Sequence, residues 1–175
     1  MHRSPWVKGR GHQTARHLIP QEPDYFSWGF TRSPYTRTLS TYSAALQHGT
    51  RWPQMFKGEK PVTFEEYVLS LPDKWSVRPH ALPMAQFLCN REGKVLVDFV
   101  GQFEHIERDW EYVSRRVTGK HHQLGHANKS EHKTIEEMYT AEMIGVVNDV
   151  YSVDFDIFGY HTIIPFNPCR EIRDE

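Results

Sequence analysis

Two short apolar segments, separated by a long stretch with helical patterns, constrain the fold of this chain more than any other feature. Residues 25–31 (YFSWGFT) are rich in aromatic side chains, and residues 95–100 (VLVDFV) are short, apolar and β-branched. Both compositions are typical of strands. Two parallel strands need a crossover of a dozen or more residues between them, and this crossover is usually a helix. Strands that are separated by helices are therefore expected to pair in parallel. The pattern predicts an α/β sandwich, although two or three strands are few for a stand-alone doubly wound sheet.

Helical patterns surround these two segments. The segment 33–46 begins with Ser and Pro, which favour the N-cap and the first helical position. Thr63, followed by Glu66, forms a capping box and predicts a short helix. Apolar residues with helical spacing predict one helix over 104–117 and another within 134–151. The residues expected to face inward are Ile106, Trp110, Val113 and Val117 in the former helix, and Met143, Ile144, Val147 and Tyr151 in the latter.

Composition excludes several classes of protein. The chain has 175 residues, with 21 Lys and Arg against 22 Asp and Glu, so no excess of positive charge indicates nucleic-acid binding. Cys89 and Cys169 are too few for a disulfide framework or a four-ligand zinc site, and reduced thiols in a cytosolic setting are the simplest interpretation. No run of about 18 apolar residues occurs, and the N-terminal segment has no apolar core. We therefore expect a chain of cytoplasmic or unassigned location, without signal peptide or membrane anchor in this sequence. We expect 1–175 to form one domain in which 1–11 are poorly ordered.

The junction between the first strand and the following helix is suited to an anion. Arg32 follows the strand directly, where a helix N-terminus offers free N–H groups and the positive end of its dipole. A guanidinium can donate two hydrogen bonds to one phosphate. Ser40, further along the helix, adds a hydroxyl if the anion lies along that face. The alternative is that Arg32 pairs with a carboxylate and that Ser40 is a small packing residue.

The same segment resembles a known nucleotide-binding motif. FTRSPYTRTLSTY is similar to the 3′-phosphate-binding motif of sulfotransferases that use 3′-phosphoadenosine-5′-phosphosulfate (PAPS), roughly R-x-P-x-x-R-x-x-S-x-Y. The matching residues are Arg32, Pro34, Arg37, Ser40 and Tyr42. The resemblance implies that Arg32 and Ser40 bind the 3′-phosphate and that Arg37 supports the local structure.

Four further segments resemble the same family in the same order. They are GHQTAR (11–16), FVGQFEHIERDWEYV (99–113), LGHANKS (124–130) and YTAEMIGVVNDVYSVDFDIFGY (139–160). They are most similar to the carbohydrate-type sulfotransferases. The resemblance implies a P-loop-NTPase-like, three-layer sandwich with a short parallel sheet, and sulfuryl transfer from PAPS to a hydroxyl of a carbohydrate acceptor.

One element of the family pattern is not found. Family members begin with a strand and a loop resembling P-K-x-G-x-T/S, which binds the 5′-phosphosulfate, whereas residues 5–14 hold a Lys, glycines and a Thr at other spacings. We therefore expect a chain that is truncated at its N-terminus. It could be a weak enzyme, or a non-catalytic relative that binds nucleotide, a second copy or a partner chain at an exposed sheet edge. A nucleotide kinase is disfavoured because no G-x-x-x-x-G-K-[ST] occurs.

The remaining candidate residues are assigned on position or resemblance. His12 occupies the position of the catalytic base in some carbohydrate sulfotransferases, although a capping or exposed His is the alternative. Lys129, in the NKS segment, could close over the nucleotide. His80 is a candidate acceptor contact. Glu104 and His105 follow the second strand, where open α/β sheets bind ligands, although Glu104 could equally cap the next helix.

The chain has eleven histidines, and several of them cluster in one loop. These are His121, His122 and His126, with His132 nearby. Zinc needs three or four convergent ligands, and the same loop resembles a loop of the family that holds no metal. We expect no metal.

Overall fold

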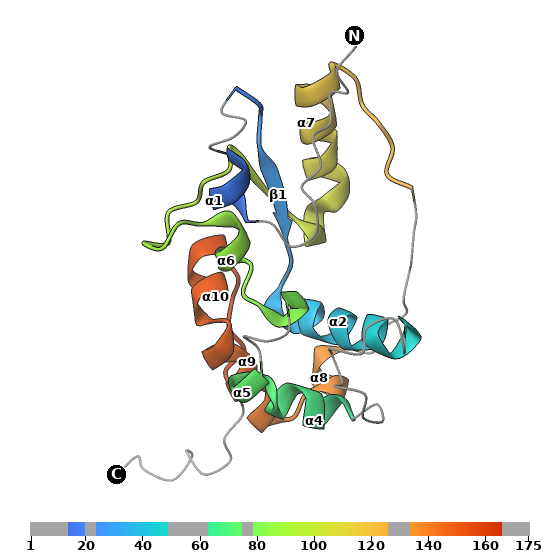
Figure 1. The fold of residues 1–175 in the computed structure, drawn as a ribbon. Helices are drawn as coiled ribbons and strands as arrows, with labels where there is room; N and C mark the ends of the chain where they lie inside the picture. The colour runs from blue at the N-terminus through green and yellow to red at the C-terminus, as the bar shows by residue number, and fades with distance from the viewer. Residues whose placement is uncertain (1–13, 20–23, 49–62, 75–78, 126–133, 166–175) are drawn as a thin grey trace, which may run out of the picture. The chain divides into compact units, whose positions relative to one another are not determined.

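The computed structural model describes residues 14–19, 24–48, 63–74, 79–125 and 134–165. The chain divides into two compact units, one made of Met1–Ser33 and Leu82–His132, the other of Pro34–Ala81 and Lys133–Glu175. The first unit holds the sheet, and the described residues of the second are mainly helical (Figure 1). The expectation that 1–175 form one domain stays a prediction.

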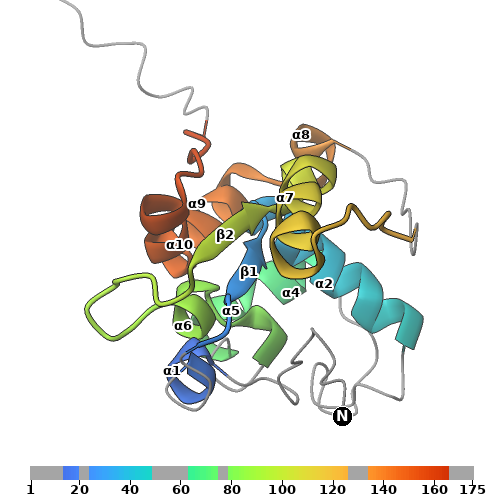
Figure 2. The same ribbon diagram turned by 90° about the horizontal axis from the view of Figure 1, so that it is seen from above.

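The sheet of the first unit is parallel, as the sequence predicts. Strand β1 (Trp28–Thr31) pairs with β2 (Phe99–Gln102), and the register runs from Trp28 opposite Phe99 to Thr31 opposite Gln102. Consequently the two strands end side by side, and the turns that follow them are neighbours (Figure 2). The described residues therefore form a mixed α/β structure with a short parallel sheet.

The second strand begins later than predicted. Val95 forms only an isolated antiparallel bridge with Cys89. Asp98 ends the irregular segment, because its carboxylate Oδ2 accepts hydrogen bonds from the Ser27 N–H at 2.8 Å and the Ser27 hydroxyl at 2.7 Å. Regular pairing starts only after this junction. Of the apolar run 95–100, only Phe99 and Val100 belong to the strand. The prediction of a strand over the whole run is therefore wrong.

Different helices cover the two faces of this sheet. A side chain at Gly29 would point at Leu88 of α6 (Ala85–Leu88), whereas one at Gly101 would meet Asp109 of α7 (Ile106–Thr118). Successive residues of a strand face opposite sides, and Gly101 follows Val100, the partner of Gly29. Hence α6 and α7 lie on opposite faces, with α1 (Ala15–Leu18) packed against α6 (Figure 2).

The second unit is built from helices around one apolar core. Its elements are α2 (Pro34–His48), α4 (Phe64–Leu69), α5 (Leu71–Lys74), the 3₁₀ turn η4 (Pro79–Ala81), α8 (Ile135–Met138), α9 (Ala141–Val150) and α10 (Ser152–Phe158). The capping box predicted at α4 is present: the Thr63 hydroxyl accepts from the Glu66 N–H, and the Glu66 carboxylate accepts from the Thr63 N–H.

The predicted helix within 134–151 is in fact two helices. The backbone of Tyr139 is extended between α8 and α9, and the Thr140 hydroxyl accepts from the Met143 N–H to start the second helix. The break lets Tyr139 turn into the core, where its hydroxyl donates to the Tyr35 carbonyl at 2.7 Å. A continuous helix would place this aromatic side chain elsewhere.

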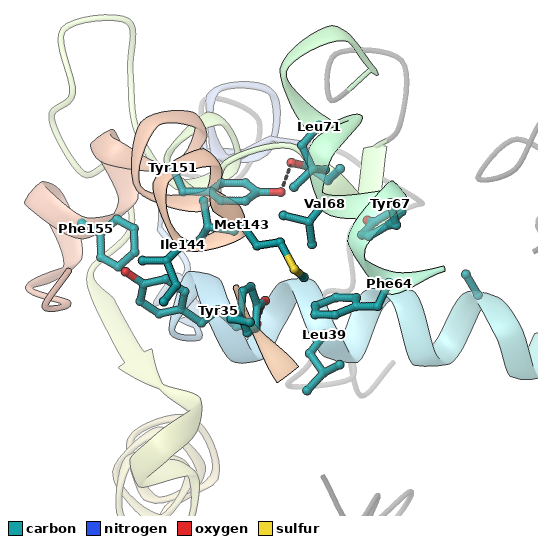
Figure 3. Close-up of a cluster of buried hydrophobic side chains, with 14 residues drawn as sticks. Tyr35, Leu39, Phe64, Tyr67, Val68, Leu71, Met143, Ile144, Tyr151 and Phe155 are labelled. Carbon is teal, nitrogen blue, oxygen red and sulfur yellow. Dashed lines mark hydrogen bonds between the residues drawn. The ribbon is translucent and has the colours of Figure 1, made fainter. Parts of the chain in front are cut away.

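The core of the second unit confirms the predicted inward face of α9. Met143, Ile144, Val147 and Tyr151 are all buried. Figure 3 shows Met143 and Ile144 in a cluster whose aromatic side chains include Tyr35 of α2, Phe64 of α4 and Phe155 of α10. A buried hydroxyl leaves water at little cost only when it is hydrogen-bonded. Tyr151 donates to the Ala81 carbonyl at 2.8 Å (Figure 3), and Tyr35 donates to the Asn148 side chain.

Within the part of the chain that the structure describes, no helix combines the length and the apolar character that a membrane crossing requires.

Candidate functional site

The candidate site lies in the first unit, where both parallel strands end. Arg32 follows β1, and the 3₁₀ turn η5 (Phe103–His105) follows β2. The Arg32 guanidinium carbon lies 4.5 Å from the centre of the Phe103 ring. The Ser33 N–H donates to Glu104 Oε1 at 2.8 Å. The segment after β1 and the turn after β2 are therefore joined by two side-chain contacts at the carboxyl edge, where open α/β sheets bind ligands.

A buried carboxylate on α7 holds the turn after β2. Asp109 accepts from the Gln102 N–H at Oδ2 and from Arg108 Nε at Oδ1, both at 2.8 Å. The residue is only 6% exposed. Burial by itself raises the pKa of the Asp109 carboxyl, but the hydrogen bonds from Arg108 and Gln102 outweigh it, and the pKa lies below its ordinary value. Asp109 is thus an ionised anchor for the last residue of β2.

Glycine at position 101 makes this anchor possible. A side-chain carbon there would lie 3.2 Å from Asp109 Cβ and would also meet the Phe30 ring. The absence of a side chain lets α7 approach the strand closely enough for Asp109 to reach the backbone of Gln102. The sequence GQ within the second strand therefore has a packing role in placing the turn.

Two predicted residues of this edge are solvent-exposed. Glu104 and His105 both project from η5 with high exposure. The Glu104 carboxylate accepts a hydrogen bond from the Ser33 N–H, which belongs to the segment after the neighbouring strand β1. This contact is different from the helix cap that the sequence offered as an alternative. Contact of Glu104 or His105 with an acceptor or nucleotide stays a prediction.

The other arginine of the motif has a structural environment. Arg37, on α2 in the second unit, lies 3.6 Å through Nη2 from Asp154 Oδ2 and stacks over the Tyr151 ring at 4.8 Å. Both charged side chains are nearly or fully buried. This ion pair is consistent with the predicted role of Arg37 in the local structure. Ser40 is half-buried on the same helix, and its participation in phosphate binding stays a prediction.

The last residue of the motif belongs to the core. The Tyr42 ring lies 5.2 Å from that of Phe64 and 5.6 Å from that of Tyr67, measured between centroids. Burial is the main cause that raises the pKa of the Tyr42 hydroxyl, and the Glu66 carboxylate adds to it. Tyr42 therefore packs α2 against α4 in the core of the second unit.

The remaining predicted site residues are not gathered at this edge by any described contact. His80 is half-buried in η4 of the second unit. His12 and Lys129 lie outside the described residues, as do His126 and His132 of the predicted histidine cluster. His122 uses Nε2 in a 2.9 Å hydrogen bond with Thr118, and no group of metal-ligating side chains occurs among the residues described.

Two residues of the edge could not be assigned from the sequence by the motif alone. Phe103 follows the second strand directly, and its 48% exposure is high for a large apolar side chain. Asp109 stands three residues after Ile106, on the apolar side of a helix whose other side is charged. A carboxylate in that position is the signal that could have indicated a buried anchor.

Comparison with known proteins supports the resemblance found in the sequence. A family model described as the sulfotransferase family matches residues 6–161. No curated protein and no solved structure matches the chain. The family implies a P-loop-like fold, PAPS as the general sulfuryl donor and a hydroxyl as acceptor. Since the match covers most of the sequence and includes the strand, the motif and the turn that form the carboxyl edge, this chain belongs to the sulfotransferase family.

Proposed function

We propose that the chain binds PAPS at the carboxyl edge of its parallel sheet and transfers the sulfuryl group to a hydroxyl of a carbohydrate. The position of Arg32 carries the proposal. This residue stands at the end of β1, in the place that the motif gives to the 3′-phosphate contact, and its neighbours come from the turn after β2. A guanidinium at such an edge can bind a phosphate through two hydrogen bonds.

The residues present fit the proposed donor at its 3′-phosphate end. Arg32 would bind that phosphate, and Ser40 would add a hydroxyl donor. Lys129 would contribute a further positive charge. PAPS, when bound, supplies an activated sulfuryl group, which an acceptor hydroxyl can take by in-line attack.

The acceptor would be handled by histidines and a carboxylate. A protonated hydroxyl is a poor nucleophile, so a base that removes its proton speeds the attack, and we assign this role to His12. Glu104 and His105 at the carboxyl edge, and His80, would contact the acceptor. Transfer then depends on positioning and on charge stabilisation, which are the main contributions in group transfer of this kind.

Arg32→Ala tests the proposal through the binding of adenosine 3′,5′-bisphosphate, the product of the reaction. Loss of a charge-assisted hydrogen bond costs about 1.5–3 kcal/mol, which corresponds to a loss of affinity of about 10–150-fold. Isothermal titration calorimetry measures this difference. The matched control is Arg115→Ala on α7, which removes an exposed arginine paired with Glu111. Equal affinities of wild type and Arg32→Ala would contradict the assignment.

A specific sequence observation favours a second candidate, a non-catalytic family member. No segment of the chain matches the family's P-K-x-G-x-T/S loop. Such a loop stabilises charge that develops on the 5′-phosphate, and removing one preorganised donor costs about 10²–10³-fold in other enzymes. Incubation with radiolabelled PAPS and a panel of carbohydrates separates the candidates: binding of the bisphosphate without detectable transfer supports the second, whereas robust transfer by the monomer excludes it.

A further inference from the structure

The turn after β2 contacts Arg32 and the residue that follows it. The Phe103 ring lies under the Arg32 guanidinium at 4.5 Å, within the range of a cation–π contact. The Glu104 carboxylate accepts the N–H of Ser33 at 2.8 Å. One contact holds the side chain of the arginine, and the other holds the main chain beside it.

These contacts have a rigid base. Asp109 of α7 binds the N–H of Gln102, the residue just before the turn, and is itself bonded to Arg108. The parallel register places Gln102 opposite Thr31, the residue just before Arg32. Arg32 and Phe103 therefore each follow one member of a pair of neighbouring strand residues. The pairing of the strands fixes the distance between the two segments that make the contacts.

Core packing does not account for the position of Phe103. Its side chain is 48% exposed, and the contact that the structure gives its ring is with the Arg32 guanidinium. A long arginine side chain has many rotamers, and ordering them opposes the binding of a ligand. A ring that keeps the guanidinium in one place removes part of this cost before the ligand arrives.

From these contacts we propose that Phe103 and Glu104 are positioning residues for Arg32: the ring orients the guanidinium, and the carboxylate fixes the backbone beside it, ready for a phosphate. The inference rests on the proposed function, since it assumes that Arg32 binds the 3′-phosphate. It assigns to η5 a role in nucleotide binding that is separate from the acceptor contact proposed for Glu104, and in which Phe103 acts only through the arginine.

A double-mutant cycle with adenosine 3′,5′-bisphosphate tests the role of Phe103. Phe103→Leu keeps an apolar side chain but removes the aromatic face, and we expect affinity to fall about 2–5-fold, the range for an exposed cation–π contact. Phe103→Tyr keeps the aromatic face, and we expect it to retain the wild-type affinity. In an Arg32→Ala background, Phe103→Leu has no further effect, because the ring acts only through the arginine. Tyr112→Leu, at an exposed aromatic residue of α7, is the matched control and leaves affinity unchanged.

A second pair of variants tests Glu104. Glu104→Ala removes the acceptor of the Ser33 N–H and lowers affinity, whereas Glu104→Gln keeps an oxygen acceptor and retains it. Titration calorimetry gives the affinities, and circular dichroism verifies that each variant is folded.

The outcomes separate this inference from the proposed function. If Phe103→Leu and Glu104→Ala both bind the bisphosphate with wild-type affinity while Arg32→Ala binds it weakly, the inference is overturned and the proposed function stands. An equal loss from Phe103→Leu in the presence and absence of Arg32 also overturns it, since that pattern indicates a general structural role. If Arg32→Ala binds as tightly as wild type, the proposed function fails and the inference fails with it.

Discussion

Arg32 and Arg37 belong to one motif but have different surroundings. Arg32 projects at the carboxyl edge over the Phe103 ring, whereas Arg37 forms an ion pair with Asp154, which is 2% exposed. A buried pair is strongly destabilised when one partner is removed, because the other charge stays in a medium of low dielectric. At the residue scale, the motif thus joins one arginine suited to a ligand with one that serves the fold.

Arg37→Met is expected to reduce the free energy of unfolding by about 3–5 kcal/mol, because it leaves the Asp154 carboxylate buried without its ion-pair partner. Urea unfolding followed by far-ultraviolet circular dichroism measures the loss. The double variant Arg37→Met with Asp154→Leu recovers most of it, since an apolar pair of similar volume replaces the charges. Arg115→Met, on an exposed ion pair, changes stability by less than about 1 kcal/mol and is the control. A loss as small as the control would contradict the structural role of Arg37.

At the scale of elements, the carboxyl edge depends on the packing of α7 against β2. Asp109 bridges the two through the Gln102 N–H, and Gly101 allows the close approach. The turn that carries Phe103 and Glu104 begins at this bridge. Loosening it would therefore act on the candidate site from outside, through the position of the turn.

Asp109→Asn is expected to lower the free energy of unfolding at pH 7 by about 1.5–3 kcal/mol, the range for hydrogen bonds to a charged group. The folded-state pKa of Asp109 is depressed below the unfolded value of about 3.9, so the contribution is present above that value and is lost as pH falls through the folded-state pKa. The difference in free energy of unfolding between wild type and variant therefore shrinks below about pH 4.

Urea unfolding at several pH values between 7 and 3 measures this difference. Glu107→Gln, at an exposed carboxylate on the same helix, is the control for stability at pH 7, where it changes the free energy of unfolding by less than about 0.5 kcal/mol. A difference between wild type and Asp109→Asn that stays constant over the whole pH range would contradict an ionised anchor.

At the scale of the whole molecule, recognition of the two ends of the nucleotide should be unequal. The motif expected to bind the 3′-phosphate is complete in the sequence, whereas no segment matches the family's loop for the 5′-phosphosulfate. A ligand bound mainly through its 3′-phosphate gains little from its 5′ group.

Adenosine 3′-monophosphate should therefore bind almost as tightly as adenosine 3′,5′-bisphosphate, while adenosine 5′-monophosphate should bind about 10–150-fold more weakly, as expected for the loss of a charge-assisted hydrogen bond. Competitive titration of the three nucleotides against the wild-type chain gives the ratios. A large loss on removal of the 5′-phosphate would indicate that residues 5–14, or a partner chain, form a second phosphate site.

The sequence by itself determined the features that depend on near neighbours. Apolar segments separated by helical patterns predicted the parallel pairing of the sheet, and Thr63 with Glu66 predicted the start of α4, because a capping box needs only residues of one helical turn. The spacing from Arg32 to Tyr42 predicted the family, which the match over residues 6–161 confirms. Arg32 could be placed at a strand end because it directly follows the aromatic segment 25–31.

Only the tertiary structure decided the features that join distant parts of the chain. Glu104 and Ser33 are 71 positions apart, and nothing in the local pattern indicates that this carboxylate accepts a main-chain N–H after the other strand. The late start of β2 depends likewise on Asp98 meeting Ser27, and the inward turn of Tyr139 on a carbonyl of α2. Such contacts arise from the register of the strands and the packing of helices, which a one-dimensional pattern does not specify.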